Sequence, residues 1–500
     1  MMKKLLSLLL CALLCMFCLI GCAKMKDGTA ENMMDDGGMP FGDVSGTLDA
    51  SATLDGSIIE NEFVNTADTP VSTFAADVDT ASYAYFRKLV NQDYDWDSLI
   101  ATAGNHMRTE EMINYFQYQY DGPAAGELFG VNAVIADCPW NENSKLMVLG
   151  LQSETTNERK PNNLVFLIDV SGSMSSNDKL PLLKEAFATL VGQLTADDRI
   201  SIVTYSGKER VVLEGCPGNQ GDRIIKAVNS LEANGSTNGE AGLQKAYALA
   251  EEYRIADGNN RIIMASDGDL NVGISSQEDL QRYISDKRNE GVFLSVLGFG
   301  TGNYRDSKME TIANHGNGVY YYIDGESEAE KVLGSDLFST LYTVAKDTKL
   351  QVTFSPEHIA QYRLVGYENR RLAAEDFADD SKDGGEVGAG HCLTICYELI
   401  ITDKATESTE PWMTLAIRYK EPDGTKSQLN EYSIGAEALT DTPSEDFTFT
   451  ANVVMVSMLL HKSRYIQNVT LADIIENLGE LSLSAPDRTE FYTLLQKLKK

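Results

Sequence analysis

Basic residues are scarce in this sequence. Its 500 residues include 42 Lys and Arg against 74 Asp and Glu, which gives a formal net charge of −32 at pH 7. A nucleic-acid-binding surface needs a cluster of basic side chains, and loose adsorption to anionic lipid needs one too. We therefore predict no nucleic-acid partner. An acidic surface instead keeps a protein soluble and attracts cations.

Cysteine and histidine are also scarce, with eight and five residues. The four cysteines that follow Cys22 are Cys138, Cys216, Cys392 and Cys396. Four are too few for a disulfide scaffold in so long a chain, and none has convincing zinc-site spacing. We expect buried free thiols, although a bridge from Cys138 to one of the others stays possible. No His-Glu-x-x-His pair is present, so a zinc protease is not predicted.

The first residues carry a targeting pattern. Lys3 and Lys4 precede an apolar run over residues 5–20, which is too short and too close to the start for a typical spanning helix. The run ends in Leu19-Ile20-Gly21-Cys22, which resembles a bacterial lipobox. The resemblance implies that residues 1–21 are removed and that an acyl chain such as palmitate anchors Cys22 to the membrane. An uncleaved membrane anchor is the alternative; in both cases we expect the folded part outside the cytoplasm, in the cell envelope.

The rest of the chain divides into segments of different character, as expected for several folded units. The Gly- and Asp-rich residues after Cys22 are typical of a flexible tether. In the next segment we expect Asp79 and Thr80 to cap a helix. The predicted segments are the tether (22–60), an N-terminal helical segment (61–122), β-strands (123–160), an α/β unit (161–343), further β-strands (344–440) and a C-terminal helical segment (441–500).

The central segment alternates between strand and helix patterns. Leu164–Ile168 is a continuous apolar run, which is typical of a buried parallel strand. Similar runs follow at 200–205, 261–265 and 292–297, with amphipathic stretches at 179–194, 222–231, 239–253 and 277–289. This pattern predicts an α/β fold with a doubly wound, mostly parallel sheet between two layers of helices. Because strand patterns flank this unit on both sides, we predict that it is inserted in a β-sandwich.

Oxygen-bearing side chains follow the first strand of this unit. Asp169, Ser171 and Ser173 lie within five residues of one another. Ligands bind at the carboxyl ends of the strands in such folds, and oxygen ligands suit a hard divalent cation. Two later loops, one with Thr237 and one with Asp267, are placed to complete the site.

Together these residues resemble the metal-ion-dependent adhesion site of the von Willebrand factor type A family. The resemblance implies Mg²⁺, Ca²⁺ or Mn²⁺ at the site, with direct contacts from the three hydroxyls and water-mediated contacts from the two carboxylates. An open coordination position would then accept a Glu or Asp side chain of a protein partner. A shift of the last helix, at about residues 328–342, would switch the affinity as it does in relatives.

A longer resemblance extends beyond this unit. Phe74–Tyr83, Glu110–Phe116, Cys138-Pro-Trp140 and Asp383–His391 are similar to segments of the YfbK-type bacterial lipoproteins. Leu297–Asn303 is also similar to a segment of these lipoproteins. Its glycines suggest a dinucleotide-binding fingerprint, but Asn303 stands where that pattern needs its third Gly. We therefore predict no nucleotide cofactor. The resemblance implies a cell-envelope protein and brings no known reaction.

We predict a binding module rather than an enzyme. A metal-dependent hydrolase is one alternative, with the cation as Lewis acid. It would need a general base, for which Asp269 is the one nearby candidate in the motif. The other alternative is a structural envelope component whose cation only stabilises the fold.

Overall fold

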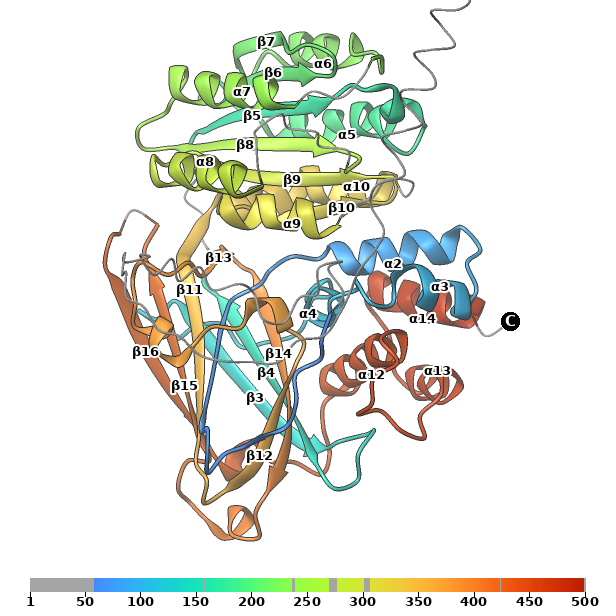
Figure 1. The fold of residues 1–500 in the computed structure, drawn as a ribbon, viewed down its shortest axis with the longest axis vertical. Helices are drawn as coiled ribbons and strands as arrows, with labels where there is room; N and C mark the ends of the chain where they lie inside the picture. Colours follow the sequence, from blue (N-terminus) through green and yellow to red (C-terminus); the bar gives the residue numbers. More distant parts are fainter. Residues whose placement is uncertain are drawn as a thin grey trace, which may run out of the picture. The chain divides into compact units, whose positions relative to one another are not determined.

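The computed structural model describes residues 58–155, 159–235, 239–268, 277–300, 306–422 and 424–498. Figure 1 shows the strands and helices of this part of the chain. None of the helices described there is long and apolar enough to cross a membrane. The predicted signal, the lipidation residue Cys22 and most of the tether lie outside the described residues.

The central unit contains one twisted sheet with the strand order β10-β9-β8-β5-β6-β7. Neighbouring strands are parallel, except that β7 is antiparallel to β6. β5 is buried along its whole length, as its uninterrupted apolar sequence predicts. The strands are β5 (Asn162–Asp169), β6 (Arg199–Tyr205), β7 (Arg210–Pro217), β8 (Asn259–Ser266), β9 (Phe293–Phe299) and β10 (Tyr320–Ile323). The predicted doubly wound α/β fold is confirmed.

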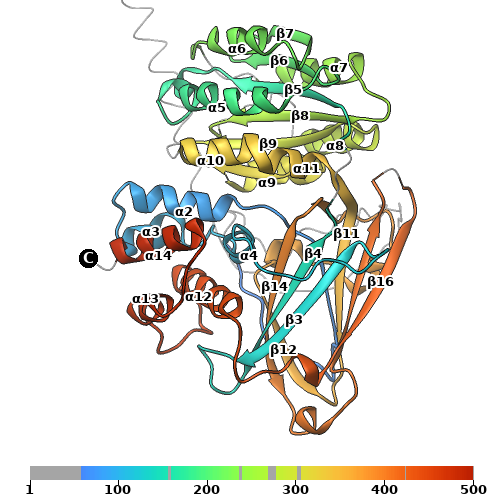
Figure 2. The ribbon, with the colours of Figure 1, turned by 180° about the vertical axis from the view of Figure 1, so that it is seen from behind.

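Helices cover both faces of this sheet (Figures 1 and 2). One face packs against α5 (Leu180–Gln193), α6 (Gly221–Asn229), α10 (Glu326–Lys331) and α11 (Leu337–Leu341). The other face packs against α7 (Glu240–Glu252), α8 (Gln277–Asn289) and α9 (Asp306–His315).

The last helix of the unit, expected at about residues 328–342, extends without a break over residues 326–341. A π-helical turn, Val332–Asp336, lies between its two α-helical parts, α10 and α11. This turn contains Gly334, and Gly is a poor helix former.

A β-sandwich flanks the central unit in sequence on both sides, as predicted. One sheet has the order β1-β12-β14-β4-β3, and the other has the order β13-β11-β15-β16 with β2 also paired to β11. Their facing side chains form a common apolar core. The strands are β1 (Val64–Asn65), β2 (Val71–Ala75), β3 (Phe129–Asp137), β4 (Lys145–Ser153), β11 (Thr343–Phe354), β12 (Ile359–Val365), β13 (Gly385–Gly388), β14 (Cys392–Ile401), β15 (Met413–Lys420) and β16 (Ser427–Ile434).

We had expected a helical segment over residues 61–122, but this segment also contains β-strands. β1 pairs with β12, and β2 pairs with β11 from Ala75–Lys349 to Val71–Thr353, so this segment supplies two strands to the sandwich. These pairings join residues that are far apart in sequence, and the short strands give little local pattern of their own.

The N- and C-terminal helices form one layer that shares a core with the outer face of β3, β4 and β14. The last part of the predicted C-terminal helical segment contains two helices, and the second begins at Pro486, a favourable first position for proline. Helix α2 also reaches the central unit, because Ala81 and Ala84 belong to the core under β10. The helices are α2 (Ala81–Asn91), α3 (Trp96–Ala103), α4 (Thr109–Asn114), α12 (Glu445–Leu460), α13 (Leu471–Gly479) and α14 (Pro486–Leu498).

Candidate metal centre

The central sheet reverses its strand order between β5 and β8. From β5 the chain proceeds outward through β6 and β7, and it then returns to β8 on the other side and proceeds to β9 and β10. Such a switch point opens a crevice at the carboxyl ends of the strands. Asp169 is the last residue of β5, and Asp267 directly follows β8. The topology thus brings two residues from different predicted loops to one crevice.

The loop after β5 is folded by its own polar groups. The Ser171 backbone N–H donates to Asp169 Oδ1 at 2.8 Å. The hydroxyls of Ser171 and Ser173 lie 3.0 Å apart and share a hydrogen bond. Ser171 is buried at 2 % exposure, whereas Ser173 is exposed. The loop therefore has one buried hydroxyl and one exposed hydroxyl side by side.

The loop that contains Thr237 approaches this same turn. The Asn234 N–H donates to the Val170 carbonyl at 2.6 Å, and the Gly172 N–H donates to the Gly235 carbonyl at 3.1 Å. Thr237 itself and Asp269 lie outside the described residues. Their roles as ligand and as candidate base stay predictions.

Two carboxylate oxygens in the crevice have no hydrogen-bond partner within the described part of the chain. They are Asp169 Oδ2 and Asp267 Oδ1, on residues that are 0 % and 1 % exposed. The buried Tyr205 hydroxyl at the end of β6 is a polar neighbour of Asp169, but the two groups make no hydrogen bond of good geometry. A buried carboxylate oxygen without a partner is costly, and a cation removes that cost. Burial raises the pKa of Asp169 to about 6, and the neighbouring Asp267 adds to this rise. The residues present therefore fit a divalent ion.

Sequence reasoning missed one charged residue of this crevice. Lys179 Nζ donates to Asp267 Oδ2 at 2.8 Å and to the Ser173 carbonyl at 2.9 Å. Its position directly before α5 gave no indication that its side chain turns back to the metal loops. Lys179 therefore connects the loops after β5 and β8.

A second group of carboxylates gathers outside this crevice: Asp77, Asp79, Glu111 and Glu310. All four are buried, and two arginines hold them. Arg370 bonds Asp77 at 2.8 Å and Asp79 at 3.2 Å; Arg108 bonds Glu111 at 3.1 Å and Glu310 at 2.5 Å. This ion-pair network joins the N-terminal segment, α4, α9 and the sandwich.

The expected cap of α2 is wrong. The N-cap residue Thr80 makes no side-chain cap hydrogen bond, and Asp79 Oδ1 instead accepts from the Tyr320 N–H at 2.9 Å. Asp79 thus connects the start of α2 to β10. Its partner is distant in sequence, so local pattern reasoning could not find it.

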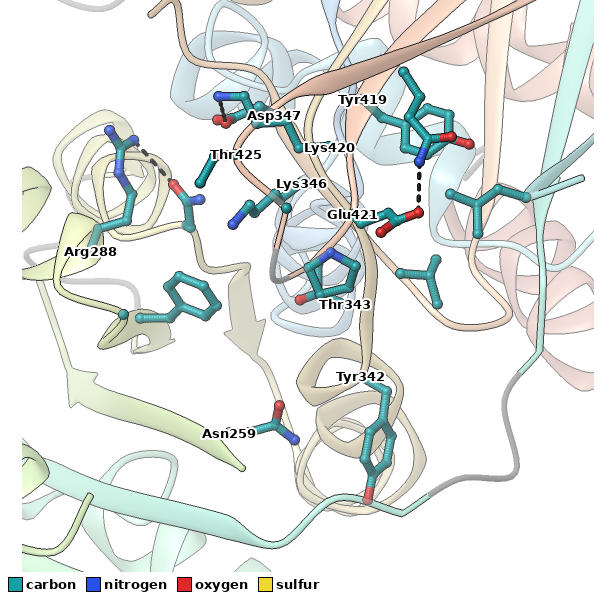
Figure 3. Close-up of a pocket in the computed structure, with 18 of the residues that line it drawn as sticks. Asn259, Arg288, Tyr342, Thr343, Lys346, Asp347, Tyr419, Lys420, Glu421 and Thr425 are labelled. Atoms are coloured by element: carbon teal, nitrogen blue, oxygen red, sulfur yellow. Dashed lines mark hydrogen bonds and ion pairs between the residues drawn. The ribbon is translucent and has the colours of Figure 1, made fainter. Parts of the chain in front are cut away.

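A cavity of about 1230 Å³ lies at the opposite ends of the same strands (Figure 3). It is lined by Asn259 at the start of β8, by Tyr342 and by the sandwich residues around Lys346. Many of its charges are paired, as in Arg288–Asp383 and Lys420–Asp347, both at 2.6 Å. Because the cavity lies at the amino ends of the strands, it is separate from the candidate metal site around Asp169.

Comparison with known proteins shows the family to which the chain belongs. Residues 163–334 match the family described as von Willebrand factor type A domain, and residues 55–148 match a family described as von Willebrand factor. The central unit is a von Willebrand A domain, a class that points to protein–protein interaction or adhesion. Residues 339–500 match "Uncharacterized protein YfbK, C-terminal". The chain is 38 % identical over 464 residues to "Uncharacterized protein YfbK" of Escherichia coli (strain K12), across 87 % of this chain and 79 % of that protein. It therefore belongs to the YfbK family.

Other similarities cover less of the chain or are weaker. Human inter-alpha-trypsin inhibitor heavy chain H3 is 33 % identical over 182 residues, which span 34 % of this chain and 20 % of that protein. A solved structure, the von Willebrand factor type A protein from Catenulispora acidiphila, is 17 % identical with a TM-score of 0.43, and covers 69 % of this chain and 89 % of that chain.

Proposed function

We propose that this protein is a lipid-anchored component of the cell envelope that binds a protein partner through a divalent cation. The cation, Mg²⁺ or else Ca²⁺ or Mn²⁺, would be held by Asp169, Ser171, Ser173, Thr237 and Asp267. The observation that carries the proposal is the pair of buried carboxylates at the switch point, each with an unpartnered oxygen, beside two adjacent serine hydroxyls.

The residue types account for the choice of partner. Neutral hydroxyls contribute no negative charge, so a bound cation keeps part of its own charge and supplies a Lewis-acidic contact for an anionic oxygen. Ser173 is exposed, so the site is open to a partner at that side. The carboxylate of a Glu or Asp side chain of a partner protein would supply this anionic oxygen. The acidic net charge of the chain does not prevent it, because salt screens distant charges beyond about 8 Å.

The metal is tested first by calorimetry. We expect Mg²⁺ or Mn²⁺ to bind the purified protein, and we expect binding to be lost in Asp169→Ala and strongly weakened in Thr237→Ala. Thr442→Ala, which changes an exposed threonine before α12, serves as the matched control and should bind as the unaltered protein does.

The partner is tested by crosslinking and capture from intact cells with the same variants. Capture that is lost with EDTA and in Thr237→Ala, but kept in Thr442→Ala, supports the metal-bridged contact. Capture that is insensitive to both would contradict it. Turnover of ester or phosphate substrates that requires the metal would favour the hydrolase instead.

The lipid anchor is an independent part of the proposal. It rests on the sequence Leu19-Ile20-Gly21-Cys22. Mass spectrometry of the N-terminal peptide from the membrane fraction should find an acylated Cys22. Cys22→Ala should release the protein from that fraction, and an unmodified Cys22 in membrane-bound protein would refute the anchor.

A further inference from the structure

Lys179 brings a positive charge into the metal site. Its Nζ donates to the carboxylate of Asp267 and to the carbonyl of Ser173, and its side chain is 12 % exposed. An ammonium group that donates two hydrogen bonds in a mostly buried position is held there, unlike a solvated surface lysine.

The surrounding backbone makes room for this side chain. Gly300, which follows β9, has a φ of +73°, and a Cβ atom at this residue would lie 2.2 Å from Lys179 Cε. The Gly300 carbonyl is held by the Tyr322 hydroxyl at 2.9 Å. The residue before Lys179 is fixed as well, because Asp178 accepts from Lys88 Nζ of α2 at 2.8 Å. Lys179 is therefore positioned from several elements.

We propose that Lys179 is a specificity-determining residue of the metal site: it weakens binding of the cation and strengthens binding of an anionic ligand once the cation is present. This inference rests on the proposed metal-bridged function and assigns a role to a residue outside the predicted set of five.

The formal charges at the site account for both effects. Asp169 and Asp267 together carry two formal negative charges, which equal the charge of a divalent ion in magnitude, and the hydroxyl ligands add none. With Lys179 beside Asp267, the same two carboxylates are partly compensated already, and the loaded site keeps a net positive charge. The ammonium group repels the incoming metal ion, so metal affinity falls. A partner carboxylate then meets a more positive site than it would without Lys179, so its attraction rises.

The first test measures Mn²⁺ affinity by calorimetry in the full-length protein. Lys179→Met keeps the length of the side chain and removes its charge. We expect it to bind Mn²⁺ at least about tenfold more tightly, because one unit charge near a divalent ion is worth more than a factor of ten even at an effective dielectric constant of about 20. Lys226→Met removes the same charge from an exposed position on α6 and should leave the affinity within about twofold of the unaltered protein.

The outcomes separate this inference from the proposed function. If both proteins bind Mn²⁺ and Lys179→Met binds it no more tightly, the role of Lys179 is refuted and the metal site stands. If neither protein binds Mn²⁺, the proposed metal site fails and this inference fails with it. Lys179→Arg keeps the charge and should retain the lower affinity, which separates charge from packing. Thermal melts of each variant show that the fold is intact.

The second test uses acetate as the probe for the anionic ligand. Acetate that enters the coordination shell displaces water from bound Mn²⁺, which lowers the water-proton relaxation enhancement. We expect the acetate concentration that gives half of the maximal decrease to be several-fold higher for Lys179→Met than for the unaltered protein. An equal or lower concentration in the variant would refute the second half of the proposal.

Discussion

Arg87 of α2 is one of the residues through which the N-terminal segment contacts Asp324 and α10 of the von Willebrand A domain; Tyr115 is another, because its hydroxyl donates to Glu328 Oε2 at 2.8 Å. Arg87 Nε and Nη2 each bond Asp324 at 2.6 Å, and Nη2 also bonds Glu328 of α10 at 2.7 Å. Its Nη1 donates to the Tyr115 hydroxyl at 2.8 Å. The side chains of Arg87, Asp324 and Glu328 are only 8 %, 8 % and 2 % exposed. Replacement of Arg87 by Ala therefore leaves two buried carboxylates without their cation.

The expected loss of stability is large. Removing one partner of a buried ion pair typically costs about 3–5 kcal/mol, because the other charge stays buried and uncompensated. Glu490 adds little, since it is 41 % exposed. We expect Arg87→Ala to lower the free energy of unfolding by about 3–5 kcal/mol, measured by urea denaturation followed by circular dichroism.

Arg282→Ala is the matched control. Arg282 pairs with Asp279 at 3.4 Å, and the two side chains are 70 % and 42 % exposed. Such a surface pair contributes about 0–1 kcal/mol. If the free energies of unfolding of the Arg87→Ala and Arg282→Ala variants differ by less than about 1 kcal/mol, Arg87 does not hold the two elements together in the way the contacts indicate.

The pH dependence gives a second check on the same contact. Burial raises the pKa of Asp324, and Arg87 lowers it again. A carboxyl group whose folded pKa lies above its unfolded value costs stability as the pH rises through the folded value. Without Arg87 this pKa rises further, so the deficit of Arg87→Ala should be larger at about pH 8 than at about pH 5. Asp324→Asn combined with Arg87→Ala should recover part of the loss, and a deficit that grows toward acid pH would refute the reasoning.

Two further predictions concern buried groups elsewhere. Burial raises the pKa of Glu110 to about 8, and the nearby Glu368 adds to this rise. Raising the pH from about 5.5 to about 8.5 should therefore lower the melting temperature of the unaltered protein more than that of the Glu110→Gln variant. Equal shifts in melting temperature would contradict this prediction. The cysteines Cys138, Cys216 and Cys396 are free and buried, whereas Cys392 is partly exposed. Mass spectrometry after alkylation should find Cys392 modified first and the other three only after unfolding, and a disulfide at Cys138 would refute it.

Local patterns predicted the central sheet well and its edges poorly. The apolar runs at 164–168 and 261–265 lie within β5 and β8, because a strand buried on both faces must be apolar at every position. β7 was not predicted, since it is a half-exposed edge strand with mixed composition. β10 was also missed, because four residues give too short a pattern to assign.

The order of residues predicted part of the candidate site. A polar turn after a buried parallel strand placed Asp169, Ser171 and Ser173 at a sheet edge, and the next such strand on that side placed Asp267 there. Lys179 could not be placed in this way. Its role depends on which way one long side chain turns, and the room for that direction is left by Gly300, more than a hundred residues further along the chain.

The sequence by itself determined the class of the central fold and the chemical types of the candidate ligands, because hydrophobic periodicity and motif spacing are local properties of the chain. The tertiary structure alone decided which distant charges meet. Arg87 with Asp324, Arg370 with Asp79 and Lys179 with Asp267 are each brought together by strand order and helix packing. The energy of a buried charge depends on the neighbours that folding supplies, and no local pattern contains that information.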